Sequence, residues 1–193
     1  MKPLTFYLVD VFAERKYAGN PLAVFRDADE LTSGEMQQIA REMNFSETTF
    51  VLSDEPRDGG YDVRIFTPVA EVPFAGHPTL GTAYVIRQEI TGNAVEQVNL
   101  NLKLRQIPVT FGREEDRSIL WMKQKSPDFG DTSDPAPMAA LLGLSAEQID
   151  ARVEQGYEID RPSLVRLSAE QRQNAIDVNV GGNVVMVAKG QWL

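Results

Sequence analysis

Residues 64–83 read Arg64-Ile-Phe-Thr-Pro-Val-Ala-Glu-Val-Pro-Phe-Ala-Gly-His-Pro-Thr-Leu-Gly-Thr-Ala83, and the rest of the chain is organised around them. A strand over residues 61–66 leads into this stretch, and its proline-rich middle excludes a helix or a central strand. Apolar residues with helical spacing follow Pro78. Proline is favoured at the first helical position, where its missing N–H is not needed, so we predict a helix that begins at Pro78.

Gly76 and His77 therefore stand at the N-terminus of that helix. A helix N-terminus offers free backbone N–H groups and a partial positive charge, which suit a carboxylate or a developing oxyanion. His77 is the single histidine of the chain. Two interpretations remain open, a tight turn with a capping histidine or a ligand-binding site, and the Gly-His-Pro motif alone favours the first.

Length and composition are typical of a globular protein with one domain or two small ones. The 193 residues are 42% hydrophobic and 24% charged, with a formal net charge of −9. Basic residues form no cluster, so we expect neither nucleic acid nor membrane as a partner. The absence of cysteine excludes disulfides, thiolate metal sites and two-cysteine racemase chemistry. No signal peptide or membrane-spanning run is found, so we expect a cytoplasmic protein.

Glu47 lies where a predicted helix gives way to a predicted apolar strand. Thr32 and Glu35 form a capping box at the start of that helix. Glu47 follows the helix, between Phe45 and Phe50. It could be a surface residue, as most glutamates are. It could equally be a desolvated acid with a raised pKa, as acid/base catalysis at neutral pH requires, and spacing does not decide between the two.

Two further turns bear on the site and the fold. Asn20 lies in Gly19-Asn20-Pro21, between strands at residues 4–12 and 22–25. Its amide either shapes the turn or faces a ligand, and the sequence slightly favours the turn. Gly181-Gly182, between two apolar strands, predicts a two-residue hairpin turn. It is not a phosphate loop, because no helix follows it.

The element pattern predicts an α+β protein with a boundary near residue 130. Strands at 98–104, 107–111 and 118–123 form an antiparallel meander beside two helices. Composition then shifts to Pro, Asp and Ser over residues 127–137. We divide the chain into an N-terminal lobe, residues 1–130, and an incomplete C-terminal lobe, residues 131–193. The second lobe is predicted to contain a helix over residues 134–143 and several strands.

Several ordered motifs run along the chain. They are Asp10-x-Phe12, Gly19-Asn20-Pro21, Ala40-Arg-Glu-Met-Asn-x-Ser-Glu-x-Thr-Phe-Val51, Arg64-Ile-Phe-Thr-Pro68 and Pro73-Phe-Ala-Gly-His-Pro78, with further motifs at residues 154–163 and 180–190. In type, order and spacing they resemble the phenazine-biosynthesis PhzF family.

The resemblance implies a diaminopimelate-epimerase-like fold, in which two α+β lobes each wrap a sheet around a central helix and the active site lies between them. It implies isomerisation of trans-2,3-dihydro-3-hydroxyanthranilate by a proton shift, with no cofactor and no metal. The family's catalytic glutamate falls on Glu47. Its substrate-binding asparagine falls on Asn20, and its Gly-His pair on Gly76 and His77. The expected ligand is a small carboxylated substrate.

The second lobe departs from the family pattern. The family's Asp-Pro-Ala-Thr-Gly-Ser-like motif is absent, and the chain passes from Leu142-Gly143-Leu144 almost directly to Glu154-Gln155-Gly156. A lobe without its central helix cannot bury a normal core. We therefore expect one sheet face to meet water, and either a homodimer, which we favour, or strands folded back onto the first lobe. The apolar residues concerned are Leu164, Val165, Leu167, Val178, Val180, Val184, Val185 and Val187.

Two functions from different classes follow. The first is a cofactor-independent isomerase or epimerase, in which Glu47 moves the proton while Gly76 and His77 hold the substrate. The second is a half-site remnant with weak or no activity, which binds a ligand or serves as a dimeric scaffold. A serine hydrolase built on Ser46 and His77 is disfavoured, because the Gly-x-Ser-x-Gly motif is absent.

Overall fold

The structure is a computed structural model that describes residues 3–92, 95–114, 117–124, 148–172 and 175–193. The first half contains β1 (Leu4–Val11), β2 (Asn20–Phe25), α1 (Ser33–Met43), β3 (Thr48–Val51), β4 (Tyr61–Phe66), β5 (Glu71–Val72), α2 (Gly76–Ile86) and the π-helical turn η1 (Arg87–Thr91). The second half contains β6 (Gln97–Asn101), β7 (Gln106–Glu114), β8 (Arg117–Lys123), β9 (Gln148–Gln155), the 3₁₀ turn η2 (Tyr157–Ile159), β10 (Ser163–Arg172), β11 (Ala175–Gly182) and β12 (Val184–Trp192).

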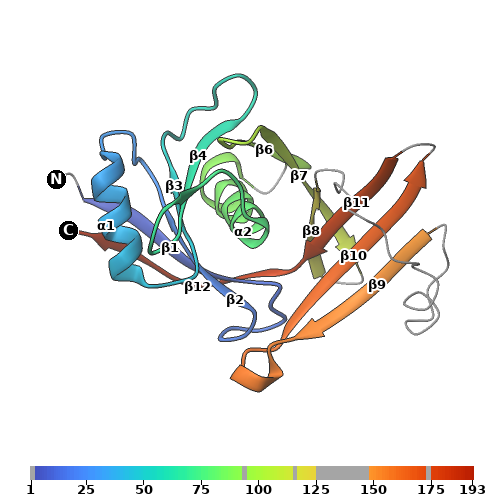
Figure 1. The fold of residues 1–193 in the computed structure, drawn as a ribbon. Coiled ribbons are helices and arrows are strands. Elements are labelled where there is room, and N and C mark those ends of the chain that lie inside the picture. The colour runs from blue at the N-terminus through green and yellow to red at the C-terminus, as the bar shows by residue number, and fades with distance from the viewer. Residues whose placement is uncertain (1–2, 93–94, 115–116, 125–147, 173–174) are drawn as a thin grey trace.

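One continuous curved sheet encloses the helix α2 (Figure 1). The strands follow the order β12-β1-β2-β3-β4-β6-β7-β8-β11-β10-β9, with the short β5 beside β4. The pairs β2–β3 and β4–β6 are parallel, whereas the other pairs are antiparallel. This mixed sheet with few helices confirms the predicted α+β class.

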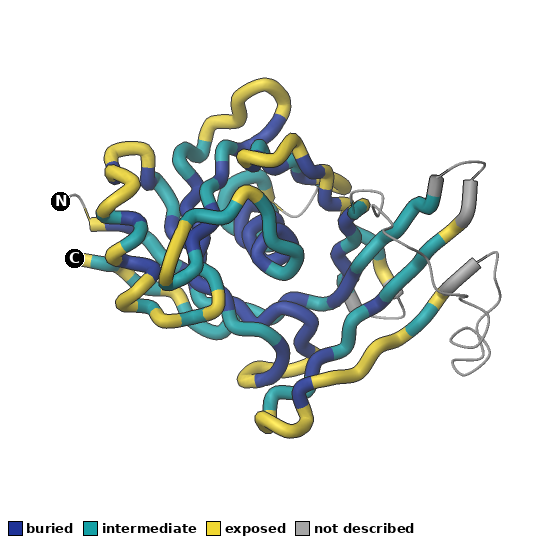
Figure 2. The backbone as a smooth tube through the Cα atoms, viewed as in Figure 1, coloured by how far each residue is buried: buried dark blue, intermediate teal, exposed yellow. Residues whose placement is uncertain are grey.

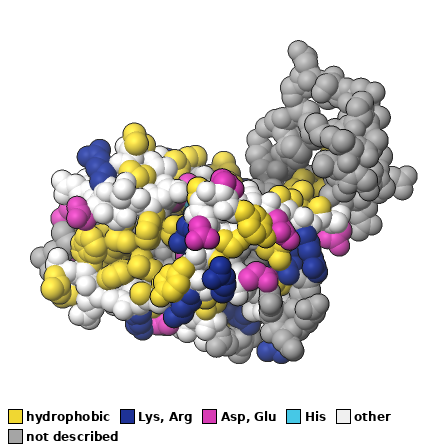
Figure 3. Space-filling view, turned by 90° about the horizontal axis from the view of Figure 1, so that it is seen from below, with side chains coloured by type: hydrophobic (Ala, Val, Ile, Leu, Met, Phe, Trp, Pro, Cys, Tyr) yellow, Lys and Arg dark blue, Asp and Glu magenta, His cyan; other side chains and the backbone are white. Residues whose placement is uncertain are grey.

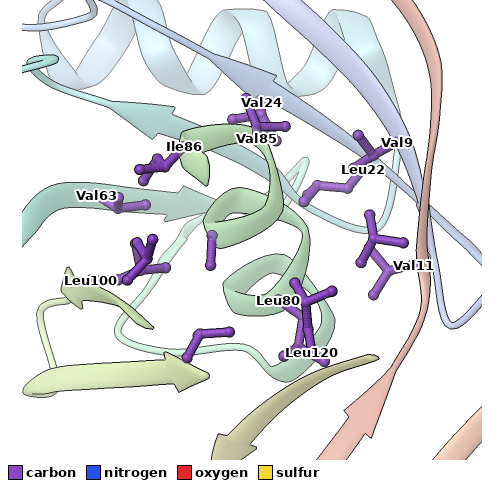
Figure 4. Close-up of a cluster of buried hydrophobic side chains, with 14 of the residues drawn as sticks. Val9, Val11, Leu22, Val24, Val63, Leu80, Val85, Ile86, Leu100 and Leu120 are labelled. Atoms are coloured by element: carbon purple, nitrogen blue, oxygen red, sulfur yellow. The ribbon is translucent and has the colours of Figure 1, made fainter. Parts of the chain in front are cut away.

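Helix α2 is buried because its sequence is apolar on all sides. Leu80, Val85 and Ile86 are completely buried. Figure 4 shows strand side chains directed at the helix from all around it, among them Val9, Val11, Leu22, Val24, Val63, Leu100 and Leu120. A Cβ atom at Gly81 would lie 2.6 Å from Cδ2 of Leu22, so a larger residue there would require this strand side chain to shift. The packing fixes the direction of α2 and thus the position of its N-terminus.

The predicted start of α2 was wrong by two residues. The helix begins at Gly76, after Ala75 as its N-cap, and Pro78 is its third residue. This position is compatible with proline, because the N–H groups of the first turn have no partner within the helix. Gly76 and His77 consequently lie within the first turn of the helix.

A second core lies on the opposite face of the sheet, beneath α1. It includes Met36 and Ile39 of the helix and the aromatic rings of Phe25, Phe50 and Phe66. The ring centroids of Phe25 and Phe50 are 5.3 Å apart. The predicted capping box at the start of α1 is confirmed, since the Thr32 hydroxyl accepts from the Glu35 N–H and the Glu35 carboxylate accepts from the Thr32 N–H. This cap and packing fix the segment that leads to Glu47.

The C-terminal strands extend the sheet of the first lobe. β11 pairs with β8, β10 and β9 follow it, and β12 returns to pair with β1 (Figure 1). The predicted hairpin at Gly181-Gly182 was wrong, because both glycines lie in β11, which does not neighbour β12. Both glycines allow close packing. An added Cβ at Gly181 would lie 2.7 Å from the Trp121 ring, and one at Gly182 would lie 2.4 Å from the Phe12 ring.

The apolar strand residues expected to meet water are half-buried, and Val184 is buried. Val165 and Val180 pack against the core around α2. The expectation that this sheet face is left uncovered was therefore wrong, because these strands continue a sheet that already has a core. Among the C-terminal strands, β9 is the most exposed (Figure 2), and its Val153 is 42% exposed. The helix predicted at residues 134–143 lies outside the described residues.

The charged residues on the surface are distributed as the sequence predicts, without a basic cluster on the face that Figure 3 draws. Acidic and basic side chains are interspersed on the face drawn in Figure 3, and no histidine shows there. Within the residues that the structure describes, no helix has both the length and the apolar character needed to cross a membrane.

Candidate active site

Glu47 lies between the end of α1 and the first residue of β3. The strand that it precedes is completely buried at Thr48, Thr49 and Phe50. The Glu47 side chain is 19% exposed, and burial raises the pKa of its carboxyl group. Of the two interpretations left open by the sequence, these properties favour the desolvated acid.

His77 faces Glu47 from the first turn of α2. Its Nε2 lies 3.4 Å from Oε2 of Glu47, and its side chain is 12% exposed. Burial lowers the pKa of His77 to about 4, although a hydrogen bond to the Pro21 backbone opposes this shift. At neutral pH the imidazole is therefore uncharged, and its contact with Glu47 is not an ion pair.

The hydrogen bond to Pro21 defines the tautomer of His77. Proline has no N–H, so its carbonyl oxygen must accept a proton from the imidazole. Nε2 has no hydrogen-bond partner, so the donor is Nδ1–H. In a neutral imidazole the other nitrogen is then a bare acceptor. The nitrogen that lies 3.4 Å from Glu47 Oε2 is consequently the unprotonated one.

Glu47 Oε2 and His77 Nε2 are both buried atoms without a hydrogen-bond partner. Buried polar atoms nearly always have one, so an unsatisfied pair requires an explanation. A protonated Glu47 could donate to Nε2, but 3.4 Å exceeds the usual length of such a bond. Both atoms are therefore left able to contact a polar atom of a ligand.

The N-terminus of α2 lies beside this pair and is left open. Its N-cap is Ala75, which makes no side-chain hydrogen bond to the helix, in contrast to the capping box of α1. The N–H groups of Gly76 and His77 have no acceptor within the helix. An added Cβ at Gly76 would make only an ordinary contact, 3.6 Å from Met122 Cε. The protein's own packing thus does not require glycine there, and the missing side chain leaves room above the helix end.

Asn20 is linked to the site through its neighbour. It is the first residue of β2 and is followed by Pro21, whose carbonyl holds His77. The Asn20 Oδ1 lies 3.5 Å from the hydroxyl of Ser163. The structure therefore brings Glu47 and His77 into contact, with Gly76 adjacent in the chain, whereas none of the described contacts joins Asn20 to Glu47.

Sequence reasoning did not find the Pro21 carbonyl, the buried hydroxyl of Thr48 or the ion pair of Asp10 with Arg161. Asp10 did leave a signal, since a carboxylate within an apolar strand is almost never fully buried unless it is paired. A backbone carbonyl and the partner in a distant turn leave none. Among the described residues no group of three or more acidic or histidine side chains could hold a metal ion.

Solved structures identify the fold as that of the PhzF and proline-racemase-like proteins. A phenazine biosynthesis protein of the PhzF family from Bacillus anthracis superposes with a TM-score of 0.84 at 20% identity, over 100% of both chains. A hydroxyproline epimerase from Agrobacterium vitis superposes with a TM-score of 0.55 at 8% identity, over 98% of this chain and 92% of that one. At these identities the likeness is one of fold alone.

Sequence comparison identifies the family. The model of the family described as "Phenazine biosynthesis-like protein" matches residues 9–150. The trans-2,3-dihydro-3-hydroxyanthranilate isomerase of Pseudomonas aeruginosa is 40% identical over 149 residues, which are 77% of this chain and 52% of that protein. The enzyme of the same name from Pseudomonas fluorescens is 42% identical over 147 residues, 76% of this chain and 48% of that protein. The chain belongs to the phenazine-biosynthesis PhzF family and spans about half the length of these curated relatives.

Proposed function

We propose that this chain carries the acid/base half of an isomerase site that shifts a proton between two carbons of a small carboxylated ring without a cofactor. The main support is the contact of Glu47 Oε2 with His77 Nε2, two buried atoms without partners. The names of the Pseudomonas relatives suggest trans-2,3-dihydro-3-hydroxyanthranilate as the substrate to test first.

Glu47 moves the proton. As a carboxylate it takes a proton from one ring carbon, and the electron pair of the broken C–H bond moves into the ring as an enol-like system. The resulting carboxylic acid then returns the proton to another carbon, so the product is an isomer of the substrate. The raised pKa of Glu47 suits both steps, because an acid/base group is most effective when its pKa approaches the working pH.

His77 and the start of α2 hold the reacting groups and do not take the proton. The unprotonated Nε2 of His77 faces the Glu47 carboxyl group at 3.4 Å and keeps its acid form oriented. The N–H groups of Gly76 and His77 bind the substrate carboxylate or the developing oxyanion, where a fixed dipole stabilises negative charge. Asn20, beside Pro21, contributes its amide to substrate binding.

The alternative is a half-site protein that binds the ligand but turns it over slowly or not at all. The specific support is that the chain spans about half the length of its curated relatives and lacks the family's second-lobe motif. A site without its second wall cannot exclude water from Glu47 or close around a substrate. Such a protein would act as a ligand-binding or dimeric scaffold.

Turnover and binding separate the two functions. The dihydroanthranilate would be assayed for isomerisation, and benzoate would be titrated by calorimetry as a carboxylated ring that cannot react. Isomerisation by the wild-type chain supports the enzyme. Benzoate binding without isomerisation supports the half-site protein, and the absence of both contradicts both proposals. If Glu47 moves the proton, Glu47→Gln should lose isomerisation. Glu42→Gln, at an exposed position of α1, is the matched control and should keep it.

A further inference from the structure

An ion pair outside the site joins the first strand to the turn before β10. The Asp10 side chain is only 4% exposed, and its Oδ1 lies 2.6 Å from Nη2 of Arg161. Its second oxygen accepts from the Tyr17 backbone N–H at 2.7 Å. Arg161 also donates to the Ala18 carbonyl from Nη2 and to the Gly19 carbonyl from Nε, each at 3.0 Å. One guanidinium and one carboxylate thus hold the loop over residues 17–19.

This loop requires such support because its backbone is strained. Phe12, Tyr17 and Gly19 have φ angles of 60°, 67° and 63°, which side chains other than glycine rarely adopt. Conformations of this kind persist only where the surroundings impose them. A Cβ at Gly19 would lie 2.2 Å from the Val11 carbonyl oxygen, and the Gly19 N–H donates to the Pro162 carbonyl at 3.0 Å. The loop is therefore fixed from the segment that carries Arg161.

The supported loop leads directly to the site. Gly19 precedes Asn20 and Pro21, and Asp10 is the residue directly opposite Pro21 in the β1–β2 ladder. The Pro21 carbonyl in turn accepts from His77, whose other ring nitrogen faces Glu47. A continuous series of contacts therefore runs from Arg161 through Asp10 and Pro21 to His77.

We propose that Asp10 and Arg161 are positioning residues for His77. The pair fixes the start of β2 so that the Pro21 carbonyl selects the Nδ1–H tautomer, which leaves the Nε2 that faces Glu47 unprotonated. Arginine suits this role because its planar fork serves the carboxylate and two carbonyls together, and lysine cannot reproduce that geometry. The catalytic consequence rests on the proposed function, whereas the tautomer is a property of the folded chain.

The single histidine makes the tautomer measurable without assignment. ¹⁵N spectra of the imidazole at pH 7 should show a protonated Nδ1 and an unprotonated Nε2 in the wild-type chain. In Arg161→Lys, and in Asp10→Asn combined with Arg161→Met, the signals should shift towards the averaged values of exchanging tautomers. The double variant removes both charges, so neither is left buried without a partner. Backbone amide spectra check folding, and sucrose can support a destabilised variant.

Arg64→Met is the matched control. Arg64 forms an ion pair with Glu71 at 2.9 Å and is 26% exposed, close to the 30% of Arg161, but it makes no described contact with Pro21 or His77. Its imidazole spectrum should equal that of the wild type. If the wild-type chain turns substrate over, Arg161→Lys should lower kcat more than it changes KM.

Three results would overturn the proposal. The first is a wild-type imidazole protonated at Nε2. The second is a folded Arg161→Lys or double variant with the wild-type spectrum. The third is failure of every Asp10 and Arg161 variant to fold even in sucrose, which would make the pair a folding element. Absence of turnover would contradict the proposed isomerase alone, because the spectra report the tautomer without substrate.

Discussion

Burial moves the pKa values of Glu47 and His77 in opposite directions, and in each case the uncharged form is favoured. The carboxyl pKa is raised and the imidazole pKa falls to about 4. A Glu–His contact at 3.4 Å on a protein surface would be an ion pair, but desolvation here outweighs that attraction. Burial therefore leaves His77 uncharged at neutral pH and makes Glu47 a weaker acid than an exposed glutamate.

The lowered pKa of His77 makes stability depend on pH. Between pH 6.5 and about 4 the unfolded chain binds a proton at this residue that the folded chain does not, so stability must fall as the pH drops through this window. The drop from 6.5 to about 4 corresponds to about 3 kcal/mol. His77→Asn keeps an N–H for the Pro21 carbonyl but cannot gain a proton. We expect the wild type to lose about 3 kcal/mol more than this variant between pH 7 and pH 4.

Urea unfolding at a series of pH values measures this difference. Comparison with the variant cancels the other titrating groups of the chain, apart from Glu47, whose raised pKa acts with the opposite sign. Glu47→Gln combined with His77→Asn, compared with Glu47→Gln alone, removes that contribution. Parallel stability profiles for wild type and His77→Asn would show that His77 titrates normally and is not desolvated.

At the residue scale the sequence indicated which groups to examine but not what they touch. Glu47 and His77 stood out because one lies at a helix-to-strand junction and the other is unique in the chain. The contact between them depends on how α2 lies against β2 and β3, and no local pattern records that. The contact of Arg161 with Asp10 is even harder to predict, because 151 positions separate the two residues in the sequence.

The two helices differ at their N-termini in a way that bears on function. α1 satisfies its first turn with its own Thr32 and Glu35, and the hydrogen bonds from Thr32 lower the pKa of the Glu35 carboxyl group. α2 has Ala75 in the corresponding place and no side-chain cap. An end that its own sequence leaves unsatisfied can accept a ligand anion.

Capping α2 should therefore stabilise the protein and weaken binding. In Ala75→Ser the hydroxyl can accept from the His77 N–H, because Ala75 already has the extended backbone of an N-cap. We expect unfolding to become harder by about 1 kcal/mol and benzoate affinity to fall, since the new hydroxyl competes for the same N–H group.

Thr32→Ala is the control at the other helix. It should cost about 1 kcal/mol and leave benzoate affinity unchanged, because α1 caps itself away from the site. Thermal unfolding and calorimetric titration give both quantities. Unchanged benzoate affinity in Ala75→Ser would mean that the start of α2 does not bind the carboxylate.

At the element scale the sequence predicted what is local and missed what is not. The cap and apolar stripe of α1 are encoded within the helix itself, and they were predicted correctly. Gly181-Gly182 reads locally as a hairpin, yet the glycines serve packing against Trp121 and Phe12 from distant elements. The start of α2 was placed at Pro78 because proline prefers the first position, but the structure tolerates it two residues later.

For the whole molecule, the fold follows from one continuous sheet whose strand order runs from β12 to β9. β9 ends the strand order and pairs with β10 alone among the described elements. A strand edge that no described strand covers can pair with another chain, and Val153 on this strand is 42% exposed. We propose that a second copy of the chain covers this edge in a homodimer.

Sedimentation equilibrium tests the dimer. The wild-type chain should sediment as a dimer, and Val153→Lys should shift it towards monomer, because a charge on an edge strand opposes pairing. Val69→Lys, at a loop position that is 81% exposed, should leave the dimer intact. A wild-type monomer, or equal dimers in both variants, would contradict an interface at β9.

The most direct test of Glu47 as the group that moves the proton is hydrogen exchange during turnover in D₂O. If Glu47 carries the proton as a carboxylic acid in contact with solvent, the isomer formed by the wild-type chain should contain deuterium at the newly protonated carbon. Glu47→Gln should form that deuterated product at least about a hundredfold more slowly, as expected for loss of an essential acid/base group, whereas Glu42→Gln should match the wild type. Equal rates for wild type and Glu47→Gln would contradict the assignment of Glu47 as the group that moves the proton.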